Sequence, residues 1–357
     1  MTLSIIIPVF NVEQYVRPCL ESVFKQGLDE RCFEVIVIND GTEDRSMEMI
    51  SDIISDHPNI SVIEQANQGV SSARNLGIAR AKGEYVFMLD GDDLLIENRL
   101  PFLLDCAVRS GADVVMADFL RMNSEEISHY LSGQAGLPGE KDGSAVEKSG
   151  PDLFVQDLSP YQCYPWRILF RRDHLLRHHI IFPSERNYED IPFVCEAFIR
   201  AQKCLRVSWI ANIYRFPRAG SAVSSFNRNK LLYFCQAIAH AWQLRQIKGL
   251  SEPVKTKLMD VVFCNFQVIV PNTKRCMKTP SDRRHIIDSL RQMAPDMYFD
   301  HGCRQRIVSF IWRKTPGLLF FSSDVFRLLF SLSLRIKHPG KMIRLDYRRL
   351  FHPERKN

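Results

Sequence analysis

Apolar and polar positions alternate in blocks along the first 120 residues, and the spacing within each block predicts its structure. Short apolar runs bounded by turn residues predict buried strands, whereas apolar positions three and four residues apart predict helices with one buried face. The predicted strands cover residues 3–9, 33–39, 60–63, 85–89 and 113–117. The predicted helices cover residues 12–25, 43–55, 69–81 and 96–109. This order predicts an α/β fold, a mostly parallel sheet flanked by helices and joined by right-handed crossovers.

The pattern changes after residue 122. Residues 123–150 are polar and rich in glycine and serine, with no apolar period, which predicts a long loop. Later segments predict an ordered apolar stretch, two helices and a strand, at residues 164–170, 171–178, 192–201 and 212–218. Long helical patterns follow at residues 231–247 and 253–269, so we place a domain boundary near Phe226. The predicted domains are residues 1–225 and a mainly helical, basic region at residues 226–357.

Three carboxylates follow the predicted strand 85–89, in the sequence Asp90-Gly91-Asp92-Asp93. Carboxylates this close repel one another, and a hard divalent cation such as Mg²⁺ or Mn²⁺ would remove the conflict by binding their oxygens. Gly91 would allow a sharp turn of the backbone there. An acidic turn that caps the next helix is an equally common explanation of this stretch.

Other polar residues also follow predicted strands, namely Asn11 after the first strand and Asp40 after the second. Ligands of parallel α/β sheets bind beyond the carboxyl ends of the strands, so these residues and Asp90–Asp92 are expected to meet in space. No G-x-G-x-x-G or P-loop motif follows the first strand. If a nucleotide binds, a metal ion is therefore the expected clamp for its diphosphate.

Glu189 and Asp190 stand at the start of a predicted helix. Acidic residues at this position usually cap the helix, but the position also suits a catalytic carboxylate. Two arginines near the end of the first domain, Arg215 and Arg218, could add positive charge to a departing diphosphate. Surface salt bridges are the commoner role for such arginines.

Charge is distributed unevenly along the chain. Residues 301–357 contain thirteen basic and three acidic residues, a net charge of +10, whereas the rest of the chain carries −4. An apolar stretch at residues 316–334 followed by basic residues favours a segment lying on an anionic membrane surface, although a core helix with a solvated basic tail is as consistent. No basic aromatic stretch predicts nucleic-acid binding.

The chain begins without a secretory signal pattern, and no apolar run reaches the ~20 residues that span a bilayer. The ten cysteines are scattered, with no C-x-x-C pair, and indicate reduced core thiols. We therefore expect a cytoplasmic protein, peripheral on the inner face of the cell membrane.

Five motifs in order resemble those of the family 2 glycosyltransferases of the GT-A fold. They are Pro8-Val-Phe-Asn11, Asn39-Asp-Gly-Thr-Glu-Asp44, Asn67-Gln-Gly-Val-Ser-Ser-Ala-Arg-Asn75, Asp90-Gly-Asp-Asp93 and Glu189-Asp190. Each motif alone is weak, but the five together, at the expected strand ends, make a strong signal. The resemblance covers about residues 1–225 and implies a GT-A, Rossmann-like mixed sheet.

The resemblance implies a role for each matching residue on the nucleotide side. Pro8 and Phe10 would line the nucleobase pocket, and Asp40 would accept a hydrogen bond from the base, usually uracil. Asn67 and Arg74 would shape the nucleotide side of the cleft. The implied donor is a nucleotide-diphosphate sugar, with UDP-sugars first.

The resemblance also implies the chemistry. Asp90 and Asp92 would form the D-x-D pair that binds the donor and Mn²⁺ or Mg²⁺, with Asp92 the direct metal ligand. Asp190 would be the base that deprotonates the acceptor hydroxyl. A metal ion that stabilises the departing diphosphate and one base suffice for an in-line displacement, which predicts inversion at the sugar carbon.

The sequence departs from the family pattern in two positions, with Asn39 where an aspartate is common and Gly91 where a serine is common. The Q-x-x-R-W signature of processive members is absent, which favours the addition of a single sugar. The expected acceptor is a glycan or a lipid-linked glycan of bacterial surface polysaccharide synthesis, near a membrane that residues 301–357 would contact.

Two alternatives stay open. A nucleotidyltransferase would also join an α/β sheet to a carboxylate-bound metal ion, but residues 11–15 lack the basic side chain that activates phosphate. The chain could also be a catalytically silent nucleotide-sugar-binding module of a membrane complex. The presence of both Asp92 and Asp190 speaks against that second alternative.

Overall fold

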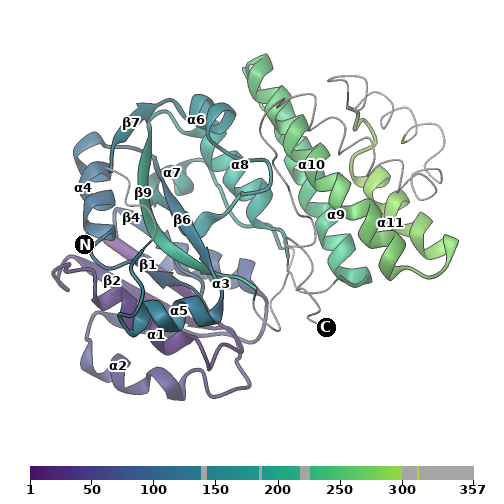
Figure 1. Ribbon diagram of the computed structural model, residues 1–357. Helices are drawn as coiled ribbons and strands as arrows, with labels where there is room; N and C mark the ends of the chain where they lie inside the picture. Colours follow the sequence, from purple (N-terminus) through teal and green to yellow (C-terminus); the bar gives the residue numbers. More distant parts are fainter. Residues whose placement is uncertain (138–142, 185–186, 218–225, 300–311, 313–357) are drawn as a thin grey trace. The chain divides into compact units, whose positions relative to one another are not determined.

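The computed structural model describes residues 1–137, 143–184, 187–217, 226–299 and 312 (Figure 1). The chain divides into two compact units, Met1–Arg218 with Gly249–Lys257, and Ala219–Lys248 with Leu258–Asn357. The predicted boundary near Phe226 stays a prediction. The sequence pattern did not indicate that residues 249–257 return to the first unit.

A parallel half of the sheet contains four strands that the sequence predicted. Their order is β3 (Ile60–Glu64), β2 (Phe33–Asn39), β1 (Leu3–Val9) and β4 (Tyr85–Met88). All three neighbouring pairs are parallel, with Val9 opposite Asn39. The carboxyl ends of β1 and β2 therefore lie together, as the sequence indicated.

Helices cover both faces of this half. On one face, α1 (Val16–Phe24) packs its apolar residues against Ile5, Ile7 and other strand residues in the main core. On the other face lies α3 (Val70–Arg80), where a Cβ on Gly77 would stand 2.4 Å from a methyl group of Ile6. The predicted helix 43–55 is instead a short 3₁₀ turn, Glu48–Ile50, followed by α2 (Ser51–Asp56).

The second half of the sheet is mixed. It continues from β4 through β8 (Ile168–Arg171), β6 (Val114–Met122), β9 (Cys204–Arg215) and β5 (Leu94–Leu95). β8 is antiparallel to both β4 and β6, whereas β6 and β9 are parallel. The whole sheet is thus the mixed sheet of the GT-A fold class. Besides α5, described below, the helices of this half are α4 (Leu100–Ser110), α6 (Gly150–Gln156), α7 (Arg172–Arg177) and α8 (Asp190–Arg200).

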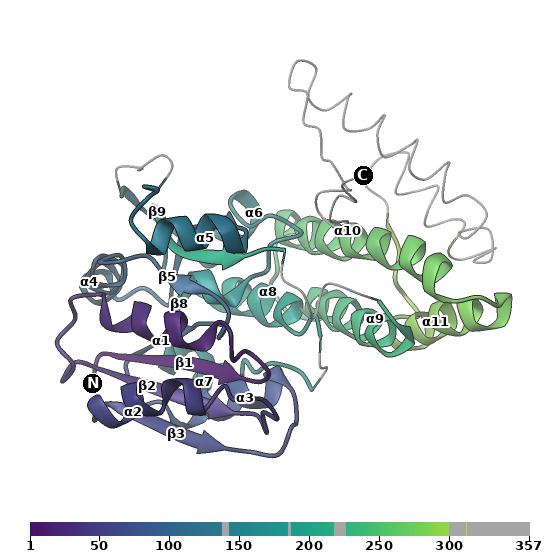
Figure 2. The ribbon, with the colours of Figure 1, turned by 60° about the horizontal axis from the view of Figure 1, so that its bottom comes forward.

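The prediction of a long loop over residues 123–150 is wrong for two parts of that segment. Residues Ser124–Leu131 form α5, which a capping box of Asn123 and Glu126 begins. Its buried Ile127 packs with residues of β5 and β9, and Figure 2 shows the helix beside β9. Residues Ala145–Lys148 form β7, which pairs with β9. Ile127 is the one buried residue of α5, so the sequence shows no apolar period that would predict this helix. Residues 138–142 lie outside the described residues.

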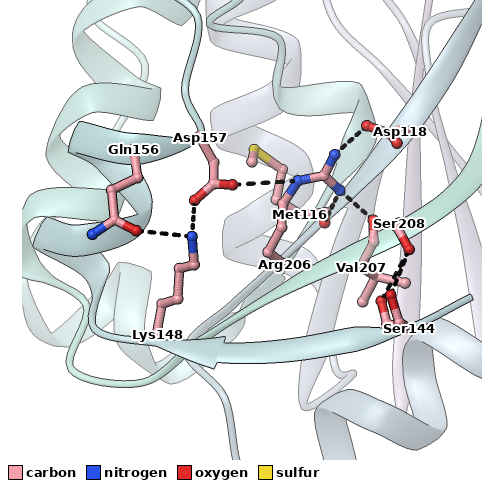
Figure 3. Close-up of polar contacts among 9 residues, drawn as sticks. All are labelled: Met116, Asp118, Ser144, Lys148, Gln156, Asp157, Arg206, Val207 and Ser208. Carbon is pink, nitrogen blue, oxygen red and sulfur yellow. Dashed lines mark hydrogen bonds and ion pairs between the residues drawn. The ribbon is translucent and has the colours of Figure 1, made fainter.

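A β-bulge lies where β6 pairs with β9, because the register shifts on both sides of Asp118. Arg206 of β9 holds this bulge. Its guanidinium donates to the Met116 carbonyl at 3.4 Å, forms an ion pair with Asp118, and lies 3.9 Å from Asp157 (Figure 3). Beyond the bulge the two strands are again in register, with Arg121 opposite Tyr214.

The second unit is helical, as predicted. It contains α9 (Arg228–Gln243), most of α10 (Glu252–Cys276) and α11 (Pro280–Met293). Trp242 of α9 donates its indole hydrogen to Asp296 at 3.0 Å. Among the described residues, no helix is both long and apolar enough to cross a membrane. The predicted membrane-facing segment, residues 301–357, lies outside the described residues except for Trp312.

Candidate active site

The acidic turn Asp90–Asp93 follows the buried strand β4 at the centre of the sheet. The turn closes through a hydrogen bond from the Asp93 amide to the Asp90 carbonyl at 2.9 Å. A Cβ on Gly91 would stand 3.2 Å from the Pro8 carbonyl oxygen of the neighbouring strand β1. Glycine therefore lets the turn approach β1 closely, as its position in the sequence suggested.

Arg215, the last residue of β9, binds this turn through both its backbone and its side chain. Its backbone amide donates to the Asp93 carboxylate at 2.8 Å, and its Nε donates to the Asp92 carbonyl at 2.9 Å. Its guanidinium also lies over the ring of Tyr15, 4.6 Å from the centroid. Burial, with repulsion from Asp92, raises the pKa of Asp93 well above its usual range. Arg215 is thus buried against the turn, and Arg218 lies outside the described residues.

Arg74 joins the acidic turn to the segment that carries Asp190. One terminal nitrogen binds Asp90 at 2.7 Å, and the other binds Glu189 at 2.8 Å. Arg74 is only 4% exposed and also lies over the ring of Phe182. A guanidinium has a rigid, forked set of donors, so it sets the separation of the two carboxylates that it bridges. The structure therefore brings the D-x-D turn and the Glu189-Asp190 pair into one site.

Asp190 is the first residue of α8 and is half-buried. Burial and the neighbouring Glu189 carboxylate, opposed by Arg74, together raise the pKa of its carboxyl from 3.8 to about 8. A carboxylate with a raised pKa is a stronger proton acceptor once it is ionised. The environment of Asp190 is therefore suited to a general base.

Asn75 is a positioning residue to which the sequence analysis gave no role. Its amide group donates to the Phe182 carbonyl at 2.7 Å and accepts from the Phe182 amide at 2.9 Å. Neighbouring residues of α3 thus hold two points of the chain that leads into α8, Asn75 at Phe182 and Arg74 at Glu189. The signal available in the sequence was the polar pair Arg74-Asn75, in a helix otherwise composed mainly of small and apolar residues.

Asp40 lies at the end of β2, 3% exposed. Its carboxylate accepts hydrogen bonds from the Gln65 side chain at 2.7 Å and from the backbone amides of Gln68 and Gly69, each at 2.9 Å. The carboxylate therefore holds the loop that contains Asn67. Its predicted hydrogen bond to a nucleobase stays a prediction.

The remaining nucleotide-side candidates lie at the same edge of the sheet. Phe10 follows β1 and is 39% exposed, whereas Pro8 is half-buried within β1. Asn67 is exposed in the loop that Asp40 holds. Gly41, with φ of +67°, lets the chain pass closely, since a Cβ there would lie 2.9 Å from the Asn67 amide.

The chemistry of the acidic turn suits a divalent cation. Within the described part of the chain, no three His, Cys, Asp or Glu side chains are arranged as a complete metal site. Asp92 and Asp90 are half-buried carboxylates at the end of β4, and Asp90 shares one oxygen with Arg74. Mg²⁺ and Mn²⁺ commonly bind one or two carboxylates and take further ligands from substrate phosphates. The residues present therefore fit such an ion only when a phosphate-bearing donor shares it.

Sequence comparisons match this architecture to one family. Residues 4–174 match glycosyl transferase family 2. The chain is 33% identical over 217 residues to the uncharacterised glycosyltransferase EpsJ of Bacillus subtilis, covering 59% of this chain and 60% of EpsJ. It is 29% identical to YibD of Escherichia coli, covering 63% of this chain and 64% of YibD. Each match spans less than two thirds of the relative's length.

Solved structures show the same fold. The chain is similar to TarS 1–349 of S. aureus in complex with UDP, with a TM-score of 0.71 and 19% identity over 92% of both chains. It also resembles the mannosyltransferase PcManGT of Pyrobaculum calidifontis in complex with GDP-Man and Mn²⁺, with a TM-score of 0.52 and 13% identity over 95% of this chain and 88% of that chain. Residues 4–174 of the chain are thus similar to glycosyltransferase family 2, and the chain has the GT-A fold.

Proposed function

We propose that the chain is an inverting, metal-dependent glycosyltransferase that moves one sugar from a UDP-sugar to a hydroxyl group of a glycan or lipid-linked acceptor. The observation that carries the proposal is the buried bridge of Arg74 between Asp90 and Glu189. The bridge joins the carboxylate turn, which suits a divalent cation shared with a donor diphosphate, to the helix that begins at Asp190. Support for the donor comes from TarS, whose structure also contains UDP-GlcNAc.

In this proposal Asp92, with Asp90, would hold Mn²⁺ or Mg²⁺. When bound, the ion supplies positive charge that stabilises the departing diphosphate. Asp190 accepts the proton of the acceptor hydroxyl, and Arg74 keeps the two carboxylate segments at a fixed separation. The acceptor oxygen then attacks the sugar carbon opposite the diphosphate, which inverts its configuration. Pro8 and Phe10 would line the nucleobase pocket, Asp40 would accept a hydrogen bond from the base, and Asn67 would shape the nucleotide side of the cleft.

UDP release tests the proposal directly. We expect the full chain to release UDP from UDP-glucose, UDP-galactose or UDP-GlcNAc in the presence of Mn²⁺, and we expect Asp92→Ala to abolish the release. Asp105→Ala, which removes an exposed aspartate of α4, is the matched control and should retain activity. Release that survives Asp92→Ala unchanged would contradict the role of the acidic turn.

Surface polysaccharide synthesis at the inner face of the membrane is the proposed setting. Relatives include a poly(ribitol-phosphate) beta-glucosyltransferase of Bacillus spizizenii, 26% identical over 79% of this chain. The net charge of +10 on residues 301–357 supports attraction to anionic lipids. Flotation with anionic liposomes, with and without residues 301–357, tests this part, and a full chain that stays in the unbound fraction would contradict it.

A further inference from the structure

Aromatic side chains gather in the mixed half of the sheet, apart from the residues assigned above. Their rings contact one another across three neighbouring segments, which places them together on one side of the sheet. We call them the aromatic cluster: Phe119 of β6, Tyr164 and Trp166 around the 3₁₀ turn Pro165–Arg167, and Tyr214 and Phe216 at the end of β9. Leu120, between Phe119 and Arg121, instead packs with the residues of α5 on the other side.

The rings form a stacked row. Tyr164 and Trp166 are parallel within 12° at a centroid distance of 4.7 Å, and Trp166 and Tyr214 stack at 5.0 Å. Phe216 continues the row at 5.9 Å from Tyr214, and the guanidinium of Arg121 lies 4.9 Å from the Phe216 ring. Mutual stacking holds the rings in fixed orientations, so the surface is formed before any ligand arrives.

The row is only partly buried. Trp166 is buried at its centre, whereas Phe119, Tyr164, Tyr214 and Phe216 are each half-exposed. Partly exposed, rigid aromatic surfaces are typical of ligand sites.

The aromatic cluster lies near both the acidic turn Asp90–Asp93 and the proposed base Asp190. β8 is antiparallel to β4, with Leu169 opposite Phe87, so the 3₁₀ turn Pro165–Arg167 that precedes β8 lies beside the acidic turn that follows β4. At one end of the row, burial raises the pKa of Tyr164, Arg121 lowers it, and the carboxylate of Asp190 raises it. Because Arg74 joins Asp90 of the acidic turn to Glu189, the neighbour of Asp190, a ligand resting on the row would lie near both that turn and the proposed base.

We propose that the aromatic cluster is the subsite for the acceptor and that the acceptor presents a pyranose ring, not an acyclic polyol or a bare lipid alcohol. A pyranose has an apolar C–H face that packs on aromatic rings, while its hydroxyl groups at the edge stay free to reach Asp190. An acyclic polyol has no such face. This inference rests on the proposed function, and it narrows the acceptor class.

The position of the cluster in the sheet argues against the donor base as its ligand. Phe10 and Pro8, proposed for the base, lie in or directly after β1, on the far side of β4 from β6 and β9 in the strand order. The two aromatic sites therefore belong to different halves of the sheet.

The test compares acceptor probes in the full chain. Methyl β-glucoside, methyl β-galactoside and methyl β-N-acetylglucosaminide are the ring probes, ribitol is the acyclic polyol, and octanol is the lipid alcohol. Tyr164→Leu and Phe216→Leu remove one ring at each end of the row but keep an apolar side chain. Phe102→Leu is the matched control, because Phe102 is also half-exposed and packs on another ring, that of Trp209, at 4.4 Å.

We expect at least one glycoside to accept the sugar, with its KM raised about fivefold in each cluster variant and unchanged in Phe102→Leu, since one aromatic contact contributes about that factor. Saturation-transfer NMR with UDP present should show the ring face of that glycoside against aromatic protons. The inference is overturned if no glycoside gives this NMR signal, if ribitol or octanol is the better acceptor, or if the control shifts KM equally. A wild-type chain that binds no UDP-sugar would instead refute the proposed function, and the NMR signal would still report on the cluster.

Discussion

The two halves of the sheet, on either side of β4, are built by different rules. In the parallel half, the strands alternate with helices along the sequence as far as β4, and the site residues stand at the strand ends. In the mixed half, β8, β6, β9 and β5 pair strands that are distant in the chain. The comparison suggests that the parallel half, proposed to bind the donor, forms from segments that are close in the sequence. The mixed half, proposed to bind the acceptor, depends on pairing between distant strands and on side chains such as Arg206.

This difference explains what the sequence could predict. The strands of the parallel half and the positions of Asp40, Asp90 and Asp92 followed from short apolar runs that end in polar residues. The two-residue strand β5 and the edge strand β7 carry too few residues for a pattern, and they form only because β9 offers them a partner.

The site was predictable to a similar extent. The motif order suggested that Asp190 and the acidic turn belong to one site, but not that Arg74 would bridge Asp90 and Glu189. A buried ion pair depends on three-dimensional approach between residues far apart in the chain, which no local pattern records. The cluster around Trp166 was missed for the same reason, because its rings come from three separate segments.

The largest expected effect is that of Arg74→Met, which cuts the link between the two halves. The change leaves the carboxylates of Asp90 and Glu189 without their shared cation, and breaking a buried pair costs about 3–5 kcal/mol. We expect urea unfolding to show this loss and UDP release to disappear. Arg109→Met, which removes an exposed i,i+4 pair with Asp105, is the control. Equal unfolding midpoints for the two variants would show that the bridge contributes little.

Asp190→Asn should lower kcat by about 10²–10⁴-fold, the usual contribution of a positioned base, with donor affinity retained. The raised pKa also predicts a pH effect on stability. Between pH 3.8 and about 8 the folded protein binds a proton that the unfolded chain has lost. The free energy of unfolding of the wild type therefore falls as pH rises through this window, by up to about 1.4 kcal/mol per pH unit.

The asparagine variant lacks this titrating group, so its unfolding free energy should fall less steeply than that of the wild type between pH 5 and pH 8. Urea titrations of both proteins at several pH values measure the difference. Parallel curves of unfolding free energy against pH would mean that Asp190 titrates at an ordinary pKa. That outcome would remove the electrostatic support for its role as a base.

Asn75→Ala should have a smaller effect, confined to the approach of α8. It removes two hydrogen bonds to the backbone of Phe182, which costs about 1–3 kcal/mol because the backbone groups lose their partner. We expect kcat to fall several-fold while the donor KM changes little. Asn272→Ala is the matched control, since Asn272 also donates to one backbone carbonyl, that of Val268 in α10. A donor KM that rises as much as kcat falls would place Asn75 on the donor side instead.

The smallest expected effect comes from Arg206→Met in the mixed half. The guanidinium holds the bulge between β6 and β9, but its side chain is 20% exposed, so the loss should be about 1–2 kcal/mol. The bulge sets the register that places Arg121 opposite Tyr214, so acceptor KM should rise while UDP-sugar binding stays unchanged. Lys203→Met, which removes a more exposed pair with Glu147, is the control. If both variants keep the acceptor KM of the wild type, strand pairing alone sets the register, and the mixed half needs no side-chain support at its bulge.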